Sequence, residues 1–440
     1  MCSRQAAGPE AARCRPAGAS SAACAMAAST MMNPPLLLST LLDRGTRMQP
    51  ENEIVTLIEG GSHRITYRQH QGRVYQLASA LKAWGVNVGD RVGTFMWNTA
   101  RHLQCYHALP SMGAVLNTLN IRLAPAELAY IIGHAECRVI ILDADLLPMV
   151  EAVDQTVLAT VGLFIVCGMD EKPGGWTSSL PHAVDWDEFL ASGSTEVISW
   201  PRDLDETSAM GLCYTSGTTG NPKGVAFSQR STYLHTMTIP MVDFFAVSAA
   251  DCVLSVVPMF HVMSWGLPFG SLMLGCKTCL NNRFMSPEAI LTMFTEEGVT
   301  FSAGVPTIWQ GVRAALESEP ALAEGLVLNR LACGGSAPAA EMMEWYLRTH
   351  NVVFLQAWGM TETNPIATVA RPIQKAKDLL KTDGERFQNI VKAGLTIPGC
   401  VCRAAYICHF SPHIVHWEGS PHCVSRSAMC LQAGTQNCGR

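Results

Sequence analysis

One stretch of the chain combines the residue types that bind phosphate groups. Residues 214–225 read YTSGTTGNPKGV, which contain glycines, hydroxyl side chains and a single lysine, Lys223. Glycines let the backbone turn its N–H groups toward an anion, hydroxyls donate short hydrogen bonds to phosphate oxygens, and lysine adds a mobile positive charge. A flexible linker has a similar composition, but here apolar, strand-like runs flank the stretch at residues 209–213 and 225–227. The pattern predicts a phosphate-binding loop, and Gly224 after the lysine excludes the G-x-x-x-x-G-K-[ST] loop of P-loop ATPases.

Alternating helix-like and strand-like patterns surround this loop. The spacing of apolar residues predicts helices over residues 70–84, 102–112, 287–297, 306–316 and 338–348, and strands over 91–97, 139–142, 163–166, 253–257, 299–302, 328–333 and 352–356. Ser286 followed by Pro287 is typical of a helix start. Strands that alternate with helices predict an α/β fold whose mostly parallel sheets are covered by helices on both faces. In such folds the active-site residues lie on loops that follow strands.

The composition excludes several classes of protein. The 440 residues include 31 Lys and Arg and 36 Asp and Glu, for a net charge of −5, and this weak negative charge gives no footprint for nucleic acid. A hydrophobic content of 48% with only 15% charged residues argues against global disorder. No apolar run reaches the length of a transmembrane helix, and the N-terminus lacks the apolar core of a secretory signal. We therefore expect an intracellular protein, cytoplasmic or mitochondrial (or in another organelle), that is not secreted.

The two ends of the chain differ from its body. Of the 17 cysteines, three lie in residues 1–30 and six in residues 400–440, while the other eight are scattered in mostly apolar surroundings and read as buried free thiols. Residues 1–30 are rich in Ala, Ser and Arg, which fits an organelle transit peptide or a disordered extension. Residues 401–440 form a divergent Cys- and His-rich tail, either a small metal site or an unstructured segment.

Four segments resemble those of the adenylate-forming (AMP-binding) superfamily, and in particular its medium- and long-chain fatty-acyl-CoA synthetases. Residues 214–225 resemble the signature loop, 257–265 (VPMFHVMSW) the segment that lines the acyl tunnel, 334–338 (GGSAP) the adenine-side loop, and 356–363 (QAWGMTET) the YGMTE motif. The resemblance covers roughly residues 35–400. It implies an AMP-binding N-terminal domain over residues 31–400, built from two α/β subdomains with mostly parallel sheets plus a distorted β-barrel portion.

The resemblance also implies an activity. It is the ATP-dependent activation of a medium- or long-chain fatty acid, or a similar apolar carboxylic acid, to an acyl-adenylate and then to acyl-CoA. ATP and CoA would be co-substrates and Mg²⁺ a cofactor, and a homodimer is conceivable.

The family's roles can be carried to matching positions of this sequence. By resemblance, the phosphates of ATP contact Thr215, Ser216, Gly217, Thr218, Thr219, Gly220 and Lys223, Thr361 contacts the α-phosphate, and Glu362 holds Mg²⁺ with Thr215 nearby. The rest of the nucleotide contacts Gly334, Gly335, Ser336, Gln356, Ala357, Trp358 and Gly359. His261 lies at the carboxylate end of the acyl tunnel, Val262 lines it, and Trp265 resembles its gate residue. Thr215, Lys223, His261 and Glu362 are the expected catalytic residues.

Simpler interpretations remain open for four of these residues. Trp358 stands where the family usually has Tyr, and it either stacks on adenine or is a core aromatic. Glu362 can be a solvated end group, and both His261 and Trp265 can be core residues. The last two lie four positions apart, so they share one face if their segment is helical.

Features of the family's smaller C-terminal domain are not recognisable. No Thr-Gly-Asp follows Cys400, and no lysine follows Arg403. The expectation is therefore that this domain is missing, that adenylation is impaired and that thioester formation is lost. The alternatives are an inactive nucleotide- or acyl-binding fragment, and an adenylating enzyme for another carboxylic acid.

Overall fold

The computed structural model describes residues 31–168, 177–215, 220–371, 393–398, 402–405 and 414–417. The chain divides into two compact units, Met1–Pro34 and Pro35–Arg440, and all the strands belong to the second. The transit-like segment 1–30 and most of the Cys- and His-rich tail lie outside the described residues. Neither expectation about these two ends is therefore tested.

The larger sheet has nine strands and carries three of the four motif segments at strand ends. Its strands in spatial order are β16 (Leu395–Thr396), β15 (Ile366–Val369), β14 (Val353–Gly359), β13 (Arg330–Cys333), β12 (Phe301–Gly304), β10 (Cys252–Ser255), β11 (Lys277–Leu280), β1 (Glu53–Ile58) and β2 (Gly61–Thr66). The pairings from β14 through to β1 are parallel, while β2, β15 and β16 pair in the antiparallel sense. The carboxyl ends of β10, β12, β13 and β14 therefore meet at one edge of the sheet.

The smaller sheet has seven strands and carries the phosphate loop. Its strands in spatial order are β7 (Ala183–Asp185), β6 (Leu163–Cys167), β5 (Val139–Asp143), β3 (Arg91–Phe95), β4 (Val115–Thr118), β8 (Ala209–Thr215) and β9 (Lys223–Ser228). Only the β8–β9 pairing is antiparallel. A separate hairpin joins β17 (Cys402–Ala405) and β18 (Ile414–Trp417). The predicted α/β class with mostly parallel sheets is thus confirmed, and a distorted β-barrel portion stays a prediction.

Helices cover both faces of each sheet, as the apolar runs of the strands require. In β5, Val139 and Ile141 join one apolar cluster, whereas Ile140 and Leu142 join another on the opposite face. The first cluster fills a central layer between the sheets, with α1 (Leu38–Met48), α2 (Tyr67–Trp84), α3 (Ala100–Met112), α7 (Trp186–Ala191) and α9 (Leu267–Leu274), against which α8 (Gln229–Thr238) packs.

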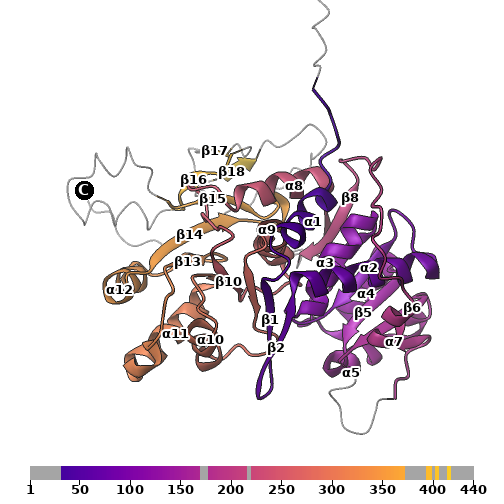
Figure 1. Cartoon of the computed structure of the whole chain (residues 1–440), viewed down its shortest axis with the longest axis horizontal. Helices are drawn as coiled ribbons and strands as arrows, with labels where there is room; N and C mark the ends of the chain where they lie inside the picture. The colour runs from indigo at the N-terminus through magenta and orange to yellow at the C-terminus, as the bar shows by residue number, and fades with distance from the viewer. Residues whose placement is uncertain are drawn as a thin grey trace, which may run out of the picture. The chain divides into compact units, whose positions relative to one another are not determined.

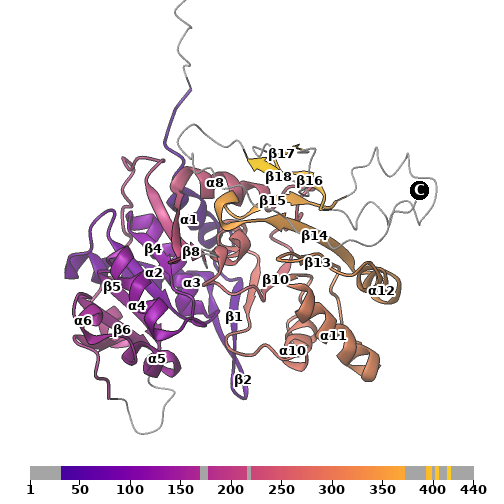
Figure 2. The same cartoon turned by 180° about the vertical axis from the view of Figure 1, so that it is seen from behind.

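Two outer layers complete the architecture. The seven-stranded sheet is covered by α4 (Pro125–Ala135), α5 (Leu147–Glu151) and α6 (Gln155–Leu158), and the nine-stranded sheet by α10 (Pro287–Glu296), α11 (Pro306–Ser318) and α12 (Ala340–His350). Figures 1 and 2 show these two groups of helices on opposite sides of the molecule. The order of layers is helix, sheet, helix, sheet, helix.

Every predicted helix and strand is present, with ends shifted by no more than three residues. The cap of α10 is as expected, since the Ser286 hydroxyl accepts a hydrogen bond from the Ala289 N–H. Helix α2 begins three residues earlier than predicted because Thr66 and Gln69 form a capping box at its start. It ends as predicted at Gly85, whose φ of 110° suits glycine.

Two further expectations concern the cysteines and membrane-spanning helices. The eight cysteines between residues 31 and 399 are buried free thiols, as predicted: Cys105, Cys137, Cys167, Cys213, Cys252, Cys276, Cys279 and Cys333. Among the helices of the described residues, none is both long enough and apolar enough to cross a bilayer.

A buried histidine makes the stability of the fold depend on pH. His102 in α3 is fully buried, with Nδ1 3.0 Å from the Trp97 carbonyl oxygen and Nε2 3.0 Å from the Thr94 hydroxyl. This arrangement suits a neutral ring that donates from Nδ1 and accepts at Nε2. Burial lowers the pKa of His102 to about 4, although the bond to Trp97 opposes this. The unfolded chain, with a His pKa of about 6.5, therefore binds more protons between pH 6.5 and 4.

We expect the free energy of unfolding to fall by about 2 kcal/mol between pH 7 and pH 5 through this one residue, because stability present above pH 6.5 is lost as pH falls toward 4. Urea titrations at both pH values measure the loss. His102→Gln should be less stable at pH 7 but should show a pH dependence smaller by that amount. The matched control is His63→Gln, at an exposed position of β2, which should keep the wild-type dependence. Identical pH dependence in His102→Gln and wild type would contradict this account.

Candidate nucleotide and acyl site

The predicted phosphate loop connects two antiparallel strands. Thr215 ends β8 and pairs with Lys223, which begins β9, and the Thr215 hydroxyl lies 3.5 Å from the Lys223 carbonyl oxygen. Lys223 is exposed, and Gly220 has a φ of 143° that favours glycine. Ser216, Gly217, Thr218 and Thr219 lie outside the described residues. The hairpin presents a hydroxyl and an ammonium group at the carboxyl end of β8.

The adenine-side segments follow neighbouring strands of the other sheet. Gly335 and Ser336 are exposed just after β13, and Gly335 has a φ of 83°. In β14, Gln356 and Trp358 are two residues apart and so point to the same face of the strand. Trp358 is half-buried, and the buried Oε1 atom of Gln356 has no hydrogen-bond partner among the described residues. Buried amide oxygens are nearly always paired, so this acceptor suits a donor supplied by a ligand.

The predicted metal ligand lies on the turn after β14. Thr361–Thr363 form a single 3-10 turn, η5, on which Glu362 is exposed. The Thr363 hydroxyl accepts from the Met360 N–H at 2.9 Å, which fixes the turn. Asn364 follows, with Oδ1 3.5 Å from the Thr232 hydroxyl of α8. The turn is thereby linked to the helix that follows the phosphate hairpin.

His261 is exposed and lies near the Arg122 guanidinium. Burial of part of the ring and the nearby Arg122 guanidinium both lower the pKa of His261. Arg122 itself lies 5.8 Å from the centre of the Phe260 ring. A neutral imidazole next to a guanidinium can receive the carboxylate end of a substrate without carrying the charge itself.

The segment after His261 is a left-handed turn, so the condition for a shared helix face is not met. If it were an ordinary helix, His261 and Trp265 would share a face, but η3 (Val262–Gly266) winds the other way. The φ angles are 48° for Val262, 51° for Met263, 49° for Ser264 and 56° for Trp265, all in the left-handed region. Each such residue with a Cβ costs roughly 1–2 kcal/mol, so the surroundings must impose the turn.

Buried hydrogen bonds and a glycine hold this left-handed turn. The Ser264 hydroxyl is buried, lies 2.6 Å from the Ser255 hydroxyl and donates to the Val257 carbonyl oxygen at 2.7 Å. Gly266 ends the turn with a φ of 77°, and a Cβ there would lie 2.7 Å from the His235 ring. Two of its restraints thus come from β10 and the residues just after it, and a third from α8.

The turn also bridges the two sheets. Met263 packs so closely on Gly211 of β8 that a Cβ on the glycine would lie 2.5 Å from the Met263 methyl carbon. Trp265 packs on Gly334, where a Cβ would lie 2.9 Å from the indole ring and 3.0 Å from the Ala357 carbonyl oxygen. Residues of the phosphate hairpin, the acyl segment and both adenine-side segments are therefore joined through one turn.

Val262 and Trp265, which we expected in the acyl tunnel, are both buried, in a cluster shared with Ala357. Burial of Trp265 agrees equally with packing and with a gate that closes a tunnel.

Several residues near the site escaped the sequence analysis. These are Arg122, Ser264, Gly211 and His134, whose Nδ1 lies 2.7 Å from the Tyr214 hydroxyl at the end of β8. Gly211 offered the one available signal, because glycine inside a strand often marks a close approach by another group.

The fold is that of solved acyl-CoA ligase structures. Among solved structures, a long-chain-fatty-acid-CoA ligase from Archaeoglobus fulgidus superimposes with a TM-score of 0.72 at 20% identity, over 88% of this chain and 76% of the other. The N-terminal domain of FACL13 from Mycobacterium tuberculosis does so with a TM-score of 0.69 at 22% identity, over 84% of both chains. At these identities the likeness establishes the fold alone.

The sequence itself supplies the family. Residues 42–403 match the AMP-binding enzyme family, and the chain belongs to it. It is 40% identical over 372 residues to a long-chain-fatty-acid–CoA ligase of Thermus thermophilus, covering 84% of this chain and 65% of the relative. A medium-chain-fatty-acid–CoA ligase of Ectopseudomonas oleovorans is 37% identical over 350 residues, covering 79% and 63%. The chain thus spans slightly less than two thirds of the length of these curated relatives.

Replacement of Ser264 tests whether the left-handed turn is strained. Ser264→Ala removes both hydrogen bonds but keeps a Cβ at a φ of 49°, so it should lower the free energy of unfolding by about 2 kcal/mol. Ser264→Gly removes the same bonds and relieves the backbone, so it should be about 1 kcal/mol more stable than the alanine variant. Urea unfolding of the three proteins measures the differences. Ser264→Gly falling at or below Ser264→Ala would show that the turn carries no backbone strain.

Proposed function

We propose that this protein forms acyl-adenylates from ATP and a medium- or long-chain fatty acid, or a similar apolar carboxylic acid, as the first step of acyl-CoA synthesis. CoA would be the acceptor in the second step. Membership of the AMP-binding family supports the reaction class, and the fatty-acid ligases among the relatives support the class of acid. One of the other relatives is a 3-methylmercaptopropionyl-CoA ligase at 39% identity, so a shorter acid is the main alternative.

One observation supports the nucleotide part of the proposal best. The unpaired Oε1 atom of Gln356 and the Trp358 ring share one face of β14, beside the exposed Gly335 and Ser336 after β13. An amide acceptor, an aromatic face and open backbone groups are what an adenine ring needs for hydrogen bonding and stacking. Trp358 would stack on the ring in place of the family's usual Tyr.

The phosphates would lie between the hairpin and the turn after β14. Adenylate formation places the carboxylate on the α-phosphate and expels pyrophosphate, so negative charge must be stabilised on the phosphate oxygens. Lys223 and the Thr215 hydroxyl would bind the β- and γ-phosphates, and Thr361 the α-phosphate. The oxygen donors of Glu362 and Thr215 suit Mg²⁺, which when bound neutralises phosphate charge.

The acid would approach along the left-handed turn. His261 and Arg122 would orient its carboxylate, since Arg122 is close enough to His261 to lower the pKa of its ring, together with burial. Val262 and Trp265 would contact the chain, where each buried CH₂ contributes about 0.8 kcal/mol. An intracellular location, cytoplasmic or mitochondrial, and a homodimer remain predictions from the sequence.

Exchange of labelled pyrophosphate into ATP tests the proposal without requiring CoA. We expect exchange that depends on the acid and is strongest with saturated fatty acids of medium or long chain, because adenylation is reversible. Acetate, benzoate and 3-methylmercaptopropionate serve as comparison acids. Preference for benzoate would rule out the fatty-acid assignment. Binding of ATP without exchange for any acid would instead identify a nucleotide-binding protein.

Glu362→Gln tests the role of the exposed carboxylate. The change keeps the size and hydrogen-bonding capacity of the side chain but removes its charge, so it should reduce exchange by about 10²–10³-fold and raise the Mg²⁺ concentration needed for half-maximal rate. The matched control is Glu341→Gln, because Glu341 is also exposed but lies in the first turn of α12. Equal rates and equal Mg²⁺ dependence in the two variants would remove Glu362 from the site.

A further inference from the structure

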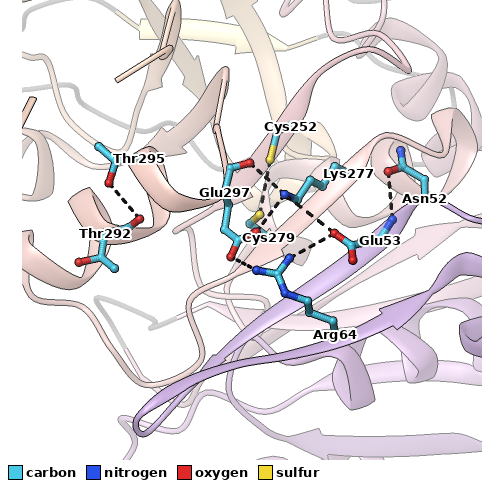
Figure 3. A network of polar contacts seen from close by, with 9 residues as sticks. All are labelled: Asn52, Glu53, Arg64, Cys252, Lys277, Cys279, Thr292, Thr295 and Glu297. Atoms are coloured by element: carbon cyan, nitrogen blue, oxygen red, sulfur yellow. Dashed lines mark hydrogen bonds and ion pairs between the residues drawn. The ribbon is translucent and has the colours of Figure 1, made fainter. Parts of the chain in front are cut away.

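Two buried thiols face each other between neighbouring strands of the nine-stranded sheet. The Sγ atoms of Cys252 and Cys279 are 3.5 Å apart, and Figure 3 shows them directed at one another with Lys277 alongside. Cys252 begins β10 and is 6% exposed, whereas Cys279 in β11 is fully buried. Both side chains lie on the face of the sheet covered by α10 and α11. None of the expected nucleotide or acyl residues directly adjoins either cysteine in the sequence; the acyl segment begins after the carboxyl end of β10.

A single ion-pair network surrounds the thiols. The Lys277 ammonium lies 2.9 Å from Oε2 of Glu297, and the same carboxylate, 2% exposed, also pairs with Arg64 of β2. Arg64 in turn is 3.2 Å from Glu53 of β1. Figure 3 shows this chain of charges running past Cys252 and Cys279. The thiols therefore lie in a polar part of an otherwise apolar layer.

These surroundings distinguish the two sulfurs. The pKa of Cys252 is lowered, mainly because Cys279 donates a hydrogen bond to its sulfur and also because of the nearby Lys277 charge. Burial and the negative charges of Glu297 and Asp251 act in the opposite direction. The same hydrogen bond, together with burial, raises the pKa of Cys279. Among the eight cysteines from Cys105 to Cys333, Cys252 alone has a lowered pKa; burial raises the pKa of Cys276, for example, to about 12. Cys252 is therefore the nucleophile of the pair and Cys279 its partner.

We propose that Cys252 and Cys279 form a redox-active dithiol that hydrogen peroxide oxidises reversibly to a disulfide. The Cys252 thiolate attacks one peroxide oxygen, the O–O bond breaks, and sulfenic acid and hydroxide form, with two electrons passing from sulfur to peroxide. The Cys279 sulfur then attacks the Cys252 sulfur, the S–O bond breaks, and hydroxide leaves with the Cys279 proton as water. Overall, two thiols and one peroxide give one disulfide and two waters.

The sulfurs are already close, but the strand register makes the bond require a local shift of the backbone. Cys279 is opposite Leu254, and Cys252 is opposite Lys277, so the two cysteines are diagonal neighbours. Their sulfurs must approach from 3.5 Å to about 2.05 Å. Cys252 is the first residue of β10, and its N–H and carbonyl oxygen form hydrogen bonds with Thr300, so a shift of Cys252 must bend these bonds.

Mass spectrometry of the full chain tests the proposal directly and does not depend on any enzymatic activity. The purified protein is treated with hydrogen peroxide without denaturant, free thiols are alkylated, and the protein is digested without reduction. We expect a cross-linked peptide pair that contains Cys252 and Cys279 and disappears after dithiothreitol. Recovery of both cysteines in alkylated form, or a cross-link from Cys252 to Cys276, would overturn the proposal.

Variants separate the roles of the neighbours. Cys279→Ala should stop at the sulfenic acid, which dimedone traps on Cys252, while Cys276→Ala should leave the cross-link unchanged. Lys277→Met should slow oxidation about three- to tenfold, because the thiolate loses its nearby cation. Arg64→Met is the matched control, since it removes the other cation on Glu297 yet leaves Lys277 in place, and it should oxidise at the wild-type rate. Equal slowing by both changes would indicate a general loosening of the sheet rather than an effect of the Lys277 charge.

Discussion

The left-handed turn at residues 262–266 is the constraint on which the arrangement of the site depends. Four consecutive non-glycine residues there have φ angles near 50°, a conformation that no isolated peptide would maintain. Ser264 holds the turn to β10, and the close packing of Met263 on Gly211 and of Trp265 on Gly334 ties it to both sheets. A Cβ on Gly334 would meet both the Trp265 ring and the Ala357 carbonyl oxygen, so glycine is required there, whereas a Cβ on Gly211 would displace the flexible end of Met263.

The layered fold explains why the motifs meet although they are far apart in the sequence. Parallel strands place their carboxyl ends at one edge of the sheet. The segments after β10, β13 and β14 therefore lie close together although they are far apart in the sequence. The phosphate hairpin belongs to the other sheet, and α8, which follows it, reaches Asn364 beside the turn that carries Glu362. The central strands β5, β6, β10 and β12 are buried along their whole length, whereas the phosphate hairpin strand β9 is largely exposed.

Much of this could be predicted from the sequence, for identifiable reasons. Period-two and helical spacing located the elements, and the predicted start of α10 at Ser286 and Pro287 was correct because capping is a local interaction. The sequence left open whether residues 261–265 are helical, because the contacts of Ser264 with Ser255 and Val257 cannot be read from residue spacing. Arg122 and His134 were missed for the same reason, since their partners, Phe260 and Tyr214, are distant in the chain. The cysteines were correctly predicted to be buried and free, but their pairing depends on strand register, which spacing alone does not reveal.

The contact between Trp265 and Gly334 joins the left-handed turn to the loop that follows β13. The indole ring lies against the loop that follows β13, and the same glycine is confined by the Ala357 carbonyl of β14. A ligand that shifts Gly334 or Gly335 by even a fraction of an ångström must therefore displace the ring or strain the strand, because close-packed interiors transmit such changes. The ring cannot move alone, since its backbone belongs to the left-handed turn that Ser264 anchors to β10. The turn, the loop after β13 and β14 therefore form one mechanical unit, in which the strained turn is the part best able to relax.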